Sequence, residues 1–438
     1  MPSTVHITKA NAGQILKGRL LTSMRIKETE DFLELVDYVL NGRVAIVIDG
    51  SPNALLCNVA GLQGRAIEEP VTEPVVRGPR DGFVEDYQMN ISLIRRRIRS
   101  SKLKVEELGV GTISKTIIAL CYIKDLAQDS LIEEVRTRIN RIDIDAIHDS
   151  GIIEELISDQ PFSLFPLAQY TERPDKVAGS LVEGKVAIIV DNSPMIIVVP
   201  ITFVSLLQAS EDYYNQFFFA SFIRVIRFVS LNIALLLPAI VVAIMTFHQE
   251  IIPDKLMGVI ITTRKELPFP IYAEVLFMEL FFEVLREAGV RLPRTIGQSV
   301  SIVGGLVIGQ ATVNAGFVGF IPVIVVSLTA VASFAIPSYA AGTSIRILRF
   351  GLIIMASFLG GVGIMLGLMF ILFYLCGLRS FGVPYLSPIA PLSPRDMKDS
   401  FIRVPWWAML TRPRLTGSSN PTRMNSNQGP VKPSKRKN

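Results

Sequence analysis

"GRVAIVIDGSP" at residues 42–52 is repeated almost unchanged as "GKVAIIVDNSP" at residues 184–194. Each stretch is a run of mostly β-branched residues followed by Asp-Gly-Ser-Pro or Asp-Asn-Ser-Pro, which is typical of a buried strand that ends in a turn. The two copies lie 184 − 42 = 142 residues apart. The chain therefore contains a duplicated unit, and we expect residues 42–60 and 184–202 to form equivalent strands of two similar α/β lobes.

The second copy is preceded by a strand and a helix that the first copy lacks. The strand is predicted for TIIALCYIKD at residues 116–125 and the helix for DSLIEEVRTRINRI at residues 129–142. At the same offset, the counterpart of that strand would begin at 116 − 142 = −26, before Met1. We therefore expect a first lobe that is incomplete at its start, either because the lobe is reduced or because the chain begins late.

Hydrophobic residues make up 50% of the 438 residues and are concentrated after residue 216. The mean hydropathy is +0.42, and residues 228–247, 295–345 and 350–378 carry no charge. Each of these stretches reaches the roughly 20 apolar residues that cross a bilayer. The sequence predicts a multi-pass integral membrane protein. Because no cleavable leader opens the chain, we expect the charged N-terminal half to stay in the cytoplasm.

Four membrane spans are predicted. They are residues 228–247, two spans within residues 296–336 that hinge near NAGFVG, and residues 350–376. The charged N-terminal half and the basic tail KPSKRKN both favour the cytoplasmic side, which requires an even number of crossings. We therefore predict that a further helix, at residues 271–289, does not fully cross.

That further helix has an acidic face. Glu279, Glu283 and Glu287 share one arc at 100° per residue, and most of the apolar residues take the other. Such a helix can lie in the membrane interface, re-enter the bilayer, or cross it with its acids turned toward the protein interior. The three acids are predicted intramembrane or interfacial residues.

A polar stripe follows the helix predicted for residues 296–314, at steps of four, three, four and four residues. Its members are Ser299, Val303, Leu306, Gln310 and Asn314. Uncharged polar groups in hydrocarbon must find partners or water. The residues alone leave two interpretations open: the stripe lines an aqueous path, or it forms hydrogen bonds between helices of the bundle.

Two pairs of glycines have the spacing that lets helix backbones approach closely. Gly305 and Gly309 form one pair, and Gly363 and Gly367 form the other. Both pairs are predicted to serve helix packing.

The sequence offers no catalytic or cofactor motif. We find no phosphate-binding Gly-x-x-x-x-Gly-Lys-Ser/Thr, no His-Glu-x-x-His and no Gly-x-Ser-x-Gly, and we predict no enzyme activity and no cofactor. The three cysteines and three histidines are widely spaced, which argues against a disulfide framework and a metal site. The basic stretch SLIRRRIRSSKLK at residues 92–104 contains no aromatic residues, so we expect no nucleic-acid binding.

Several independent stretches carry a family resemblance. They are IEEPVTEPVVRGPRDGF at 67–83, IRRRI at 94–98, ERPDKVAGSLVEGKVAIIVDNSP at 172–194, EDYYNQFFFASFIRVIRF at 211–228, FEVLREAGVRLPRTIGQSVSIVGGLVIGQA at 282–311, ASFAIPSY at 332–339 and RSFGVPYLSPIAPLSPRD at 379–396. From about residue 15 to about residue 413, the chain closely resembles the A subunit of the GerA-type spore germinant receptors.

The resemblance implies a nutrient receptor in the inner membrane of bacterial endospores. Members of that family work with a transporter-like B subunit and a lipoprotein C subunit. Their A subunits are expected to assemble into a homo-oligomeric ring in membrane lipid that conducts ions once the nutrient binds. This expectation favours the pore interpretation of the polar stripe. The incomplete start of the first lobe departs from the family pattern.

Five regions are expected. They are a first α/β lobe at 1–67, a linker and basic helix at 68–104, a second α/β lobe at 105–216, a transmembrane helical domain at 217–378 and a cytoplasmic tail at 379–438 whose end is disordered. Two alternative functions stay open. One is a spore-membrane protein of the SpoVA group, and the other is a secondary transporter, which usually shows inverted membrane repeats.

Overall fold

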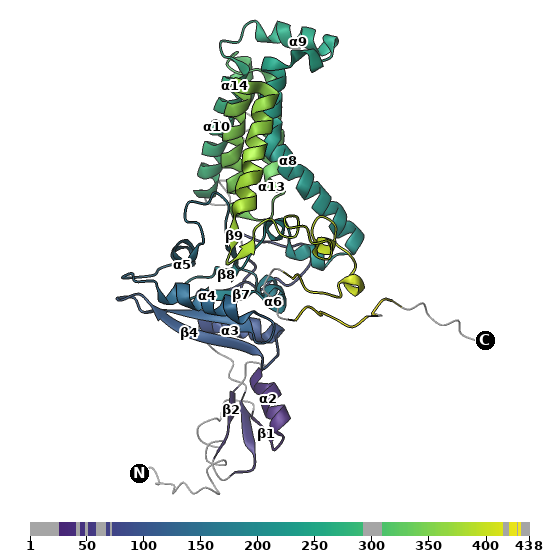
Figure 1. The fold of residues 1–438 in the computed structure, drawn as a ribbon. Coiled ribbons are helices and arrows are strands. Elements are labelled where there is room, and N and C mark those ends of the chain that lie inside the picture. The colour runs from purple at the N-terminus through teal and green to yellow at the C-terminus, as the bar shows by residue number, and fades with distance from the viewer. Residues whose placement is uncertain are drawn as a thin grey trace, which may run out of the picture. The chain divides into compact units, whose positions relative to one another are not determined.

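The computed structural model describes most of the chain, in two compact units. The described residues are 26–40, 44–48, 51–57, 67–70, 72–291, 309–414, 420–426 and 428–430. The first unit comprises Met1–Pro161, Ala168–Ile201 and Leu410–Asn438, and the second comprises Phe162–Leu167 and Thr202–Met409. Figure 1 traces the elements of both units.

The second lobe of the first unit is built on a five-stranded antiparallel sheet in the order β4-β5-β7-β8-β6. The strands are β4 (Leu103–Val110), β5 (Thr116–Ile123), β6 (Gln169–Thr171), β7 (Val186–Val190) and β8 (Ile196–Val199). The helices are α3 (Tyr87–Arg97), α4 (Asp129–Asn140), α5 (Ser150–Ile157) and α6 (Pro174–Val182).

Every residue of β7 and β8 is buried, because helices cover both faces of the sheet (Figure 1). Ala187, Ile189 and Val198 share a core with α3 and α6. Alternate residues of a strand point to opposite faces of the sheet, so Ile188 and Val190 point to the face opposite α3 and α6. Helices α4 and α5 contact the sheet on that face. The helices of this lobe thus cover both faces of its sheet.

The first lobe repeats part of this plan on a smaller sheet. Its elements are β1 (Ile26–Thr29), α2 (Phe32–Leu40), β2 (Val44–Ile46) and β3 (Ala54–Cys57). The strand order is β1-β3-β2, which matches the order β6-β8-β7 in the second lobe.

The two lobes also share one pairing register. In the first lobe Val44, Ala45 and Ile46 pair with Cys57, Leu56 and Leu55, and in the second lobe Val186, Ala187 and Ile188 pair with Val199, Val198 and Ile197. Every one of these positions shifts by the same 186 − 44 = 142 residues. The offset also carries Phe32–Leu40 onto Pro174–Val182, so α2 corresponds to α6 residue for residue. The repeated sequence therefore encodes one strand–helix–hairpin unit in both lobes.

The stretch predicted as an inter-lobe linker and basic helix packs into the second lobe. The guanidinium of Arg173 is buried and donates hydrogen bonds to the backbone oxygens of Glu73 (3.1 Å) and Pro79 (3.0 Å). Leu93 and Ile94 of α3 lie in the lobe's core. The boundary predicted at residue 105 therefore falls inside β4, and the helix ends at Arg97 instead of reaching residue 104.

The second unit is mainly helical. Its helices are α7 (Phe203–Leu206), α8 (Phe217–Phe247), α9 (Asp254–Arg264), α10 (Ile271–Arg291), α12 (Gly309–Asn314), α13 (Phe320–Phe334) and α14 (Tyr339–Gly377). Short 3-10 helices are η2 (Ser210–Tyr213), η3 (Gln249–Ile251), η5 (Asp396–Asp399) and η6 (Trp406–Ala408), and β9 (Arg379–Ser380) pairs with β10 (Val383–Pro384). Helices α8, α10, α13 and α14 pack side by side (Figure 1).

Among the described residues, α8 and α14 are long and apolar enough to cross a membrane, by length and composition. Helix α13 is shorter and also apolar. The first of the two spans predicted within residues 296–336 falls mostly on residues up to 308, which lie outside the described residues.

Helix α14 is a hairpin of two helical arms, not the single span predicted for residues 350–376. Gly360 breaks the helix with φ 59° and ψ −136°. A Cβ on Gly367 would lie 2.5 Å from Cδ2 of Leu352, although about 15 residues of straight helix would separate them by ~22 Å. Residues 339–359 and 361–377 therefore run antiparallel, and Figure 1 shows the two arms side by side.

The turn of this hairpin needs a glycine. At a positive φ of this kind a Cβ is strained, and here it would also lie 2.9 Å from Cβ and Cγ of Phe247 at the end of α8. The next residue, Gly361, donates its backbone N–H to Nε2 of His248 (3.2 Å). The turn is thereby tied to the end of α8.

We expect Gly360→Ala to lower the stability of the purified protein by about 2 kcal/mol or more, because strain and the Phe247 contact add. Gly351→Ala is the matched control, since nothing lies within 4 Å of its Cβ position in the same helix. The control is expected to be neutral or stabilising by about 0.5–1 kcal/mol. Thermal unfolding in detergent, followed by circular dichroism, measures both. Equal midpoints for the two variants would contradict the hairpin turn.

Candidate functional site: a charged cluster inside the helical bundle

Charged side chains from two apolar helices meet inside the bundle. Helix α10 contributes Glu279, Glu283 and Arg286, and α14 contributes Arg346 and Arg349. Nη2 of Arg349 lies 3.2 Å from Oε2 of Glu279 and 3.4 Å from Oε1 of Glu283. Nε of Arg346 lies 3.8 Å from Oε2 of Glu283. We call these five residues the bundle cluster.

Helical spacing explains how the bundle cluster assembles. Glu279 and Glu283 are four residues apart, and Arg346 and Arg349 are three apart, so each pair occupies one face of its helix. The two faces meet because α10 packs against α14. Glu279 and Glu283 of the acidic arc are therefore turned toward the protein interior.

The central pair of the cluster is withdrawn from the surface. The side chains of Glu279 and Arg349 are each 1% exposed. Neither carboxylate oxygen of Glu279 has a hydrogen bond, and Nε of Arg349 is also unpartnered. A buried pair with open hydrogen-bonding capacity gains little net stability, but loss of one partner leaves an uncompensated charge at a cost of about 3–5 kcal/mol.

Arg286 connects the cluster to a third helix. Its Nη2 donates to Oγ of Ser333 on α13 (2.8 Å), and its guanidinium lies 5.2 Å from the ring centroid of Phe334. It also lies 3.5 Å from Glu283 on its own helix. The cluster thus ties α10 to both α13 and α14.

A second buried acid fixes the other end of α10. Oε2 of Glu274 accepts the backbone N–H of Gly319, the N-cap of α13, at 2.8 Å, and its Oε1 lies 2.9 Å from Nη2 of Arg264. A carboxylate at a helix N-terminus satisfies an otherwise open donor and favours the helix dipole. Helix α10 is therefore anchored by acids along its length, and the prediction that it does not fully cross the membrane stays a prediction.

The structure separates the three predicted acids. Glu279 and Glu283 lie inside the bundle cluster, whereas Glu287 is exposed and pairs with Arg291 on its own helix at 2.7 Å. The sequence alone does not identify Arg346 and Arg349 as partners of these acids. Their three-residue spacing just before an apolar run was the available signal.

The predicted polar stripe is described only in part. Ser299, Val303 and Leu306 lie outside the described residues, as does Gly305. Gln310 and Asn314 lie on α12 and are exposed. Gly309 is buried, and a Cβ there would make ordinary contact with Val323 of α13 at 3.7 Å. The pore assignment of the stripe stays a prediction.

The other predicted glycine pair lies within the α14 hairpin. A Cβ on Gly363 would lie 3.0 Å from Cβ of Leu359, next to the turn. Gly367 faces Leu352 of the first arm. Both glycines thus lie where the two arms approach closely.

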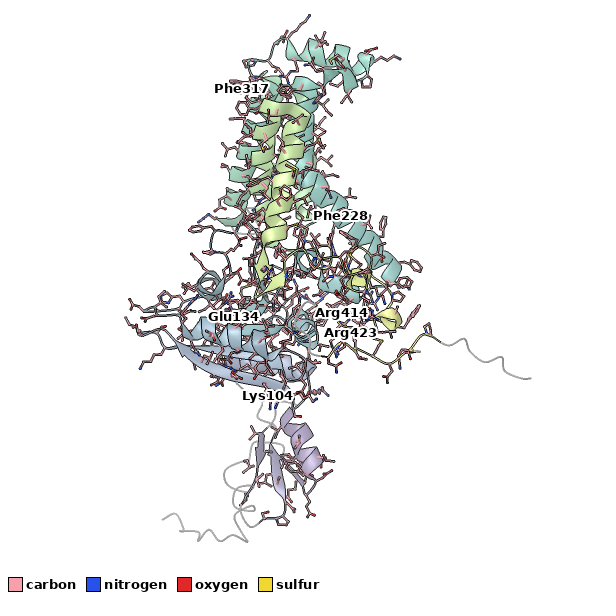
Figure 2. All side chains as sticks on the ribbon, viewed as in Figure 1. Lys104, Glu134, Phe228, Phe317, Arg414 and Arg423 are labelled. Atoms are coloured by element: carbon pink, nitrogen blue, oxygen red, sulfur yellow. The ribbon has the colours of Figure 1, made fainter. Side chains whose placement is uncertain are left out.

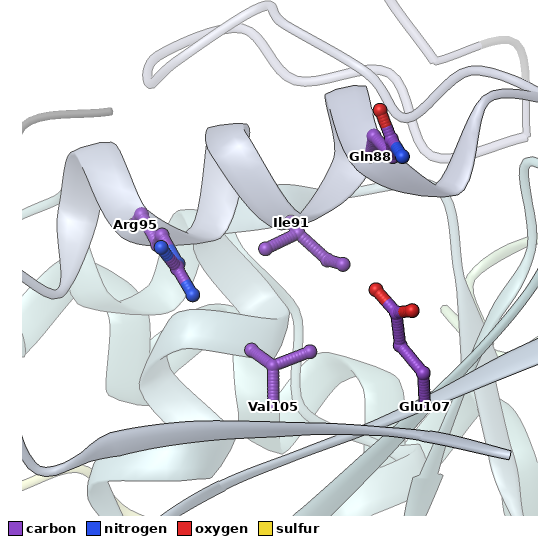
Figure 3. A pocket seen from close by; sticks show the side chains of 5 residues that line it. All are labelled: Gln88, Ile91, Arg95, Val105 and Glu107. Carbon is purple, nitrogen blue, oxygen red and sulfur yellow. The ribbon is translucent and has the colours of Figure 1, made fainter. Parts of the chain in front are cut away.

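The first unit has a shallow hollow between α3 and β4, with a volume of about 450 Å³. Figure 3 shows the five lining side chains, with Arg95 and Glu107 carrying opposite charges. The hollow is open and Glu107 is exposed, so we assign it no ligand. In the part of the chain that the structure describes, no group of three His, Cys, Asp or Glu side chains could hold a metal ion.

The fold and the bundle cluster describe a protein with a duplicated α/β region and a helical unit whose charges are paired inside. Residues 3–415 match the family Bacillus/Clostridium GerA spore germination protein. The chain belongs to this family of spore germination proteins.

Relatives agree with this assignment. Spore germination protein KA of Bacillus subtilis is 46% identical over 97% of this chain and 78% of its own length. Spore germination protein A1 of the same organism is 40% identical over 93% of this chain and 84% of its own. The membrane protein YfkQ of Bacillus subtilis is 48% identical over 87% of this chain and 74% of its own.

One solved structure is also similar. It is the N-terminal domain of the A subunit of the Bacillus megaterium spore germinant receptor GerK3, at 31% identity. The match covers 44% of this chain and 69% of the other, with a TM-score of 0.32.

We expect Arg349→Gln to lower the free energy of unfolding by about 3–5 kcal/mol, because the charge of Glu279 then has no close partner. Glu287→Gln breaks an exposed pair on the same helix and should cost at most about 1 kcal/mol. Exchanging the charges, in Glu279→Arg with Arg349→Glu, should recover part of the loss. Thermal unfolding in detergent compares the variants. If Arg349→Gln and Glu287→Gln unfold at the same temperature, the ion pairs of the bundle cluster do not stabilise the fold.

Proposed function

We propose that this protein is the A subunit of a nutrient germinant receptor and that it forms part of a nutrient-gated ion channel. The observation that carries the proposal is the family match over residues 3–415, which includes both the α/β region and the helical unit. A relative that shares 40% of its residues is named spore germination protein A1. We infer that this chain acts in the same process.

The proposed location is the inner membrane of the bacterial endospore, with the N-terminal region on the cytoplasmic side. Three properties of the second unit support a membrane. Helices α8 and α14 have the length and composition of spans, Phe358, Met365 and Phe370 of α14 are exposed, and charged side chains of α10 and α14 pair inside. The relative YfkQ is named a membrane protein.

The proposed partners are those implied by the resemblance. They are a transporter-like B subunit, a lipoprotein C subunit and further copies of this chain in a ring. In this arrangement a nutrient signal reaches the A subunits, which open a path for ions. Signal transduction and conduction are thereby divided between subunits.

The helix predicted for residues 296–314 is the proposed wall of the ion path. Gln310 and Asn314, at the end that the structure describes, are exposed side chains on an otherwise apolar chain segment. Polar groups are costly against lipid and cheap against water, so a water-filled axis is a favourable environment for them. Val303 and Leu306 would then form an apolar constriction that gates by dewetting.

Two alternative functions are less well supported. A secondary transporter usually has inverted repeats in its membrane part, whereas the duplication found here lies in the α/β region. The SpoVA group is a second alternative, and the relatives named as spore germination proteins favour the receptor subunit.

We expect spores that carry Leu306→Ser to release ions and germinate without nutrient, because a hydroxyl wets the apolar constriction. Leu306→Phe should block nutrient-triggered release while the protein is still present. Ile308→Ser is the matched control, because on a continuous helix position 308 faces away from the stripe. Ion release and loss of spore refractility, with immunoblots for protein level, measure these effects.

Cysteine accessibility provides an independent readout of the same path. Burial raises the pKa of the Cys121 thiol to about 12, so this native cysteine should stay unreactive near neutral pH. Cys57 and Cys376 are replaced by serine first. Single cysteines at 303, 306 and 310 should then react with aqueous thiol reagents. If none reacts and Leu306→Ser leaves release dependent on nutrient, the helix does not line a pore and its stripe joins helices.

A further inference from the structure

The start of α8 has charged residues inside and apolar residues outside. Arg224 and Arg227 are buried on the face that packs against the protein. The exposed side chains of the stretch 217–230 are all apolar: Phe218, Phe219, Phe222, Val225, Ile226, Phe228 and Val229. This pattern is the reverse of an amphipathic helix in water. It indicates that the outer face of this stretch, from Phe218 onward, does not face bulk water.

Buried ion pairs hold the two arginines in this orientation. The carboxylate of Asp212 lies 2.8 Å from Nε of Arg224 and 2.7 Å from Nη1 of Arg227. Nη1 of Arg224 also lies 2.8 Å from Oδ1 of Asp399. The uncharged stretch of this helix begins only at residue 228, after Arg224 and Arg227, and hydropathy therefore predicts that the first span starts there. The ion pairs remove these charges from the helix surface, so the apolar surface begins about ten residues earlier.

A segment from the far end of the chain continues this apolar surface. Oγ of Ser221 on α8 donates to the backbone oxygen of Arg403 (3.0 Å) and accepts its N–H (3.1 Å). The rings of Phe228 and Phe401 lie edge to face, with centroids 4.9 Å apart. Figure 2 labels Phe228 on α8, beside the chain segment that ends the second unit.

Residues 400–409 expose large side chains along this contact. Ile402 is 59% exposed, Trp406 is 45% exposed and Trp407 is 49% exposed. The guanidinium of Arg403 is buried beneath them, 5.3 Å from the Trp406 ring centroid, and donates to the backbone oxygen of Asp212 (2.8 Å). We call Phe218, Phe219, Phe222, Ile402, Trp406 and Trp407 the aromatic patch.

The length of α8 gives the depth of the aromatic patch. A helix of 31 residues is ~46 Å long, whereas the hydrocarbon core of a bilayer is ~30 Å thick. The uncharged residues 228–247 alone are ~30 Å long, so the turns of α8 before residue 228 extend past the hydrocarbon into the headgroup region. Tryptophan is enriched at that depth, because its ring is apolar and its N–H can bond to water or lipid.

We propose that the aromatic patch lies in the headgroup region of the lipid bilayer and that residues 400–409 are a membrane-interface anchor, not part of a cytoplasmic tail. The occupant of this surface is lipid, because the apolar face is continuous with the outer face of a spanning helix and every charge beneath it is already directed inward. The inference rests on the proposed membrane location. The test below separates the failure of one from the failure of the other.

The sequence supplies a direct probe, because its two tryptophans are both in the aromatic patch. The full-length chain is reconstituted into phosphatidylcholine vesicles whose acyl chains carry bromine either near the headgroup or near the bilayer centre. We expect shallow bromines to quench tryptophan fluorescence more than deep bromines, and aqueous iodide to quench little. Trp406→Phe and Trp407→Phe separate the two contributions.

Two relocated tryptophans in a background without Trp406 and Trp407 serve as controls. Ile113→Trp lies at an exposed site of the first unit and should be quenched by iodide alone. Phe370→Trp lies on the exposed face of α14 and should be quenched most by deep bromines.

The controls determine which proposal fails. If Phe370→Trp is quenched by lipid while the native tryptophans respond to iodide alone, the chain is inserted but the aromatic patch is in water, and the anchor is wrong. If the native tryptophans respond to neither quencher, protein covers the patch, through a second copy or another subunit, and the anchor is also wrong. If Phe370→Trp is not quenched by lipid, the proposed membrane location itself fails.

Discussion

Charges on apolar helices need partners inside the protein, and the arrangement of the second unit depends on this constraint. Two ion-pair systems meet it. Glu279 and Glu283 with Arg346 and Arg349 join α10 to α14, and Asp212 with Arg224 and Arg227 joins the start of α8 to the segment before it. A buried pair adds little net stability over apolar packing, yet it strongly disfavours every arrangement that separates the partners. Such pairs therefore select one helix arrangement among several that apolar packing would allow.

The α14 hairpin uses a different constraint, the conformational freedom of glycine. The turn at Gly360 leaves no room for a side chain next to Phe247, and Gly367 lets the second arm approach Leu352. A stretch with no charged residue from 350 to 378 gives no polar interruption to indicate where it reverses. Hydropathy alone consequently joins the second half of the first arm to the second arm as one span, because residues 350–378 carry no charge on either side of the turn.

The candidate site could be predicted from the sequence only in part. The acidic arc of α10 is visible in the four-residue spacing of Glu279 and Glu283, but the same spacing extends to Glu287, which the structure leaves exposed. Helical periodicity places residues on a face without identifying the neighbour of that face. Arg349 becomes the partner of Glu279 because α14 packs antiparallel to α10 at that level, and this is a fact of tertiary packing.

The sequence by itself determined the duplication and the equivalent strands within it. The repeat offset of 142 residues appears in the structure as one shared register, because an apolar run closed by Asp-x-Ser-Pro has one way to bury its alternate side chains in a hairpin. It also determined that the apolar residues are concentrated in the second half of the chain. Only the tertiary structure decided which charges are buried and where the helices turn. Ion pairing and close backbone contact depend on residues that are far apart in the chain. A local sequence pattern does not show which of these residues lie close together in the folded protein.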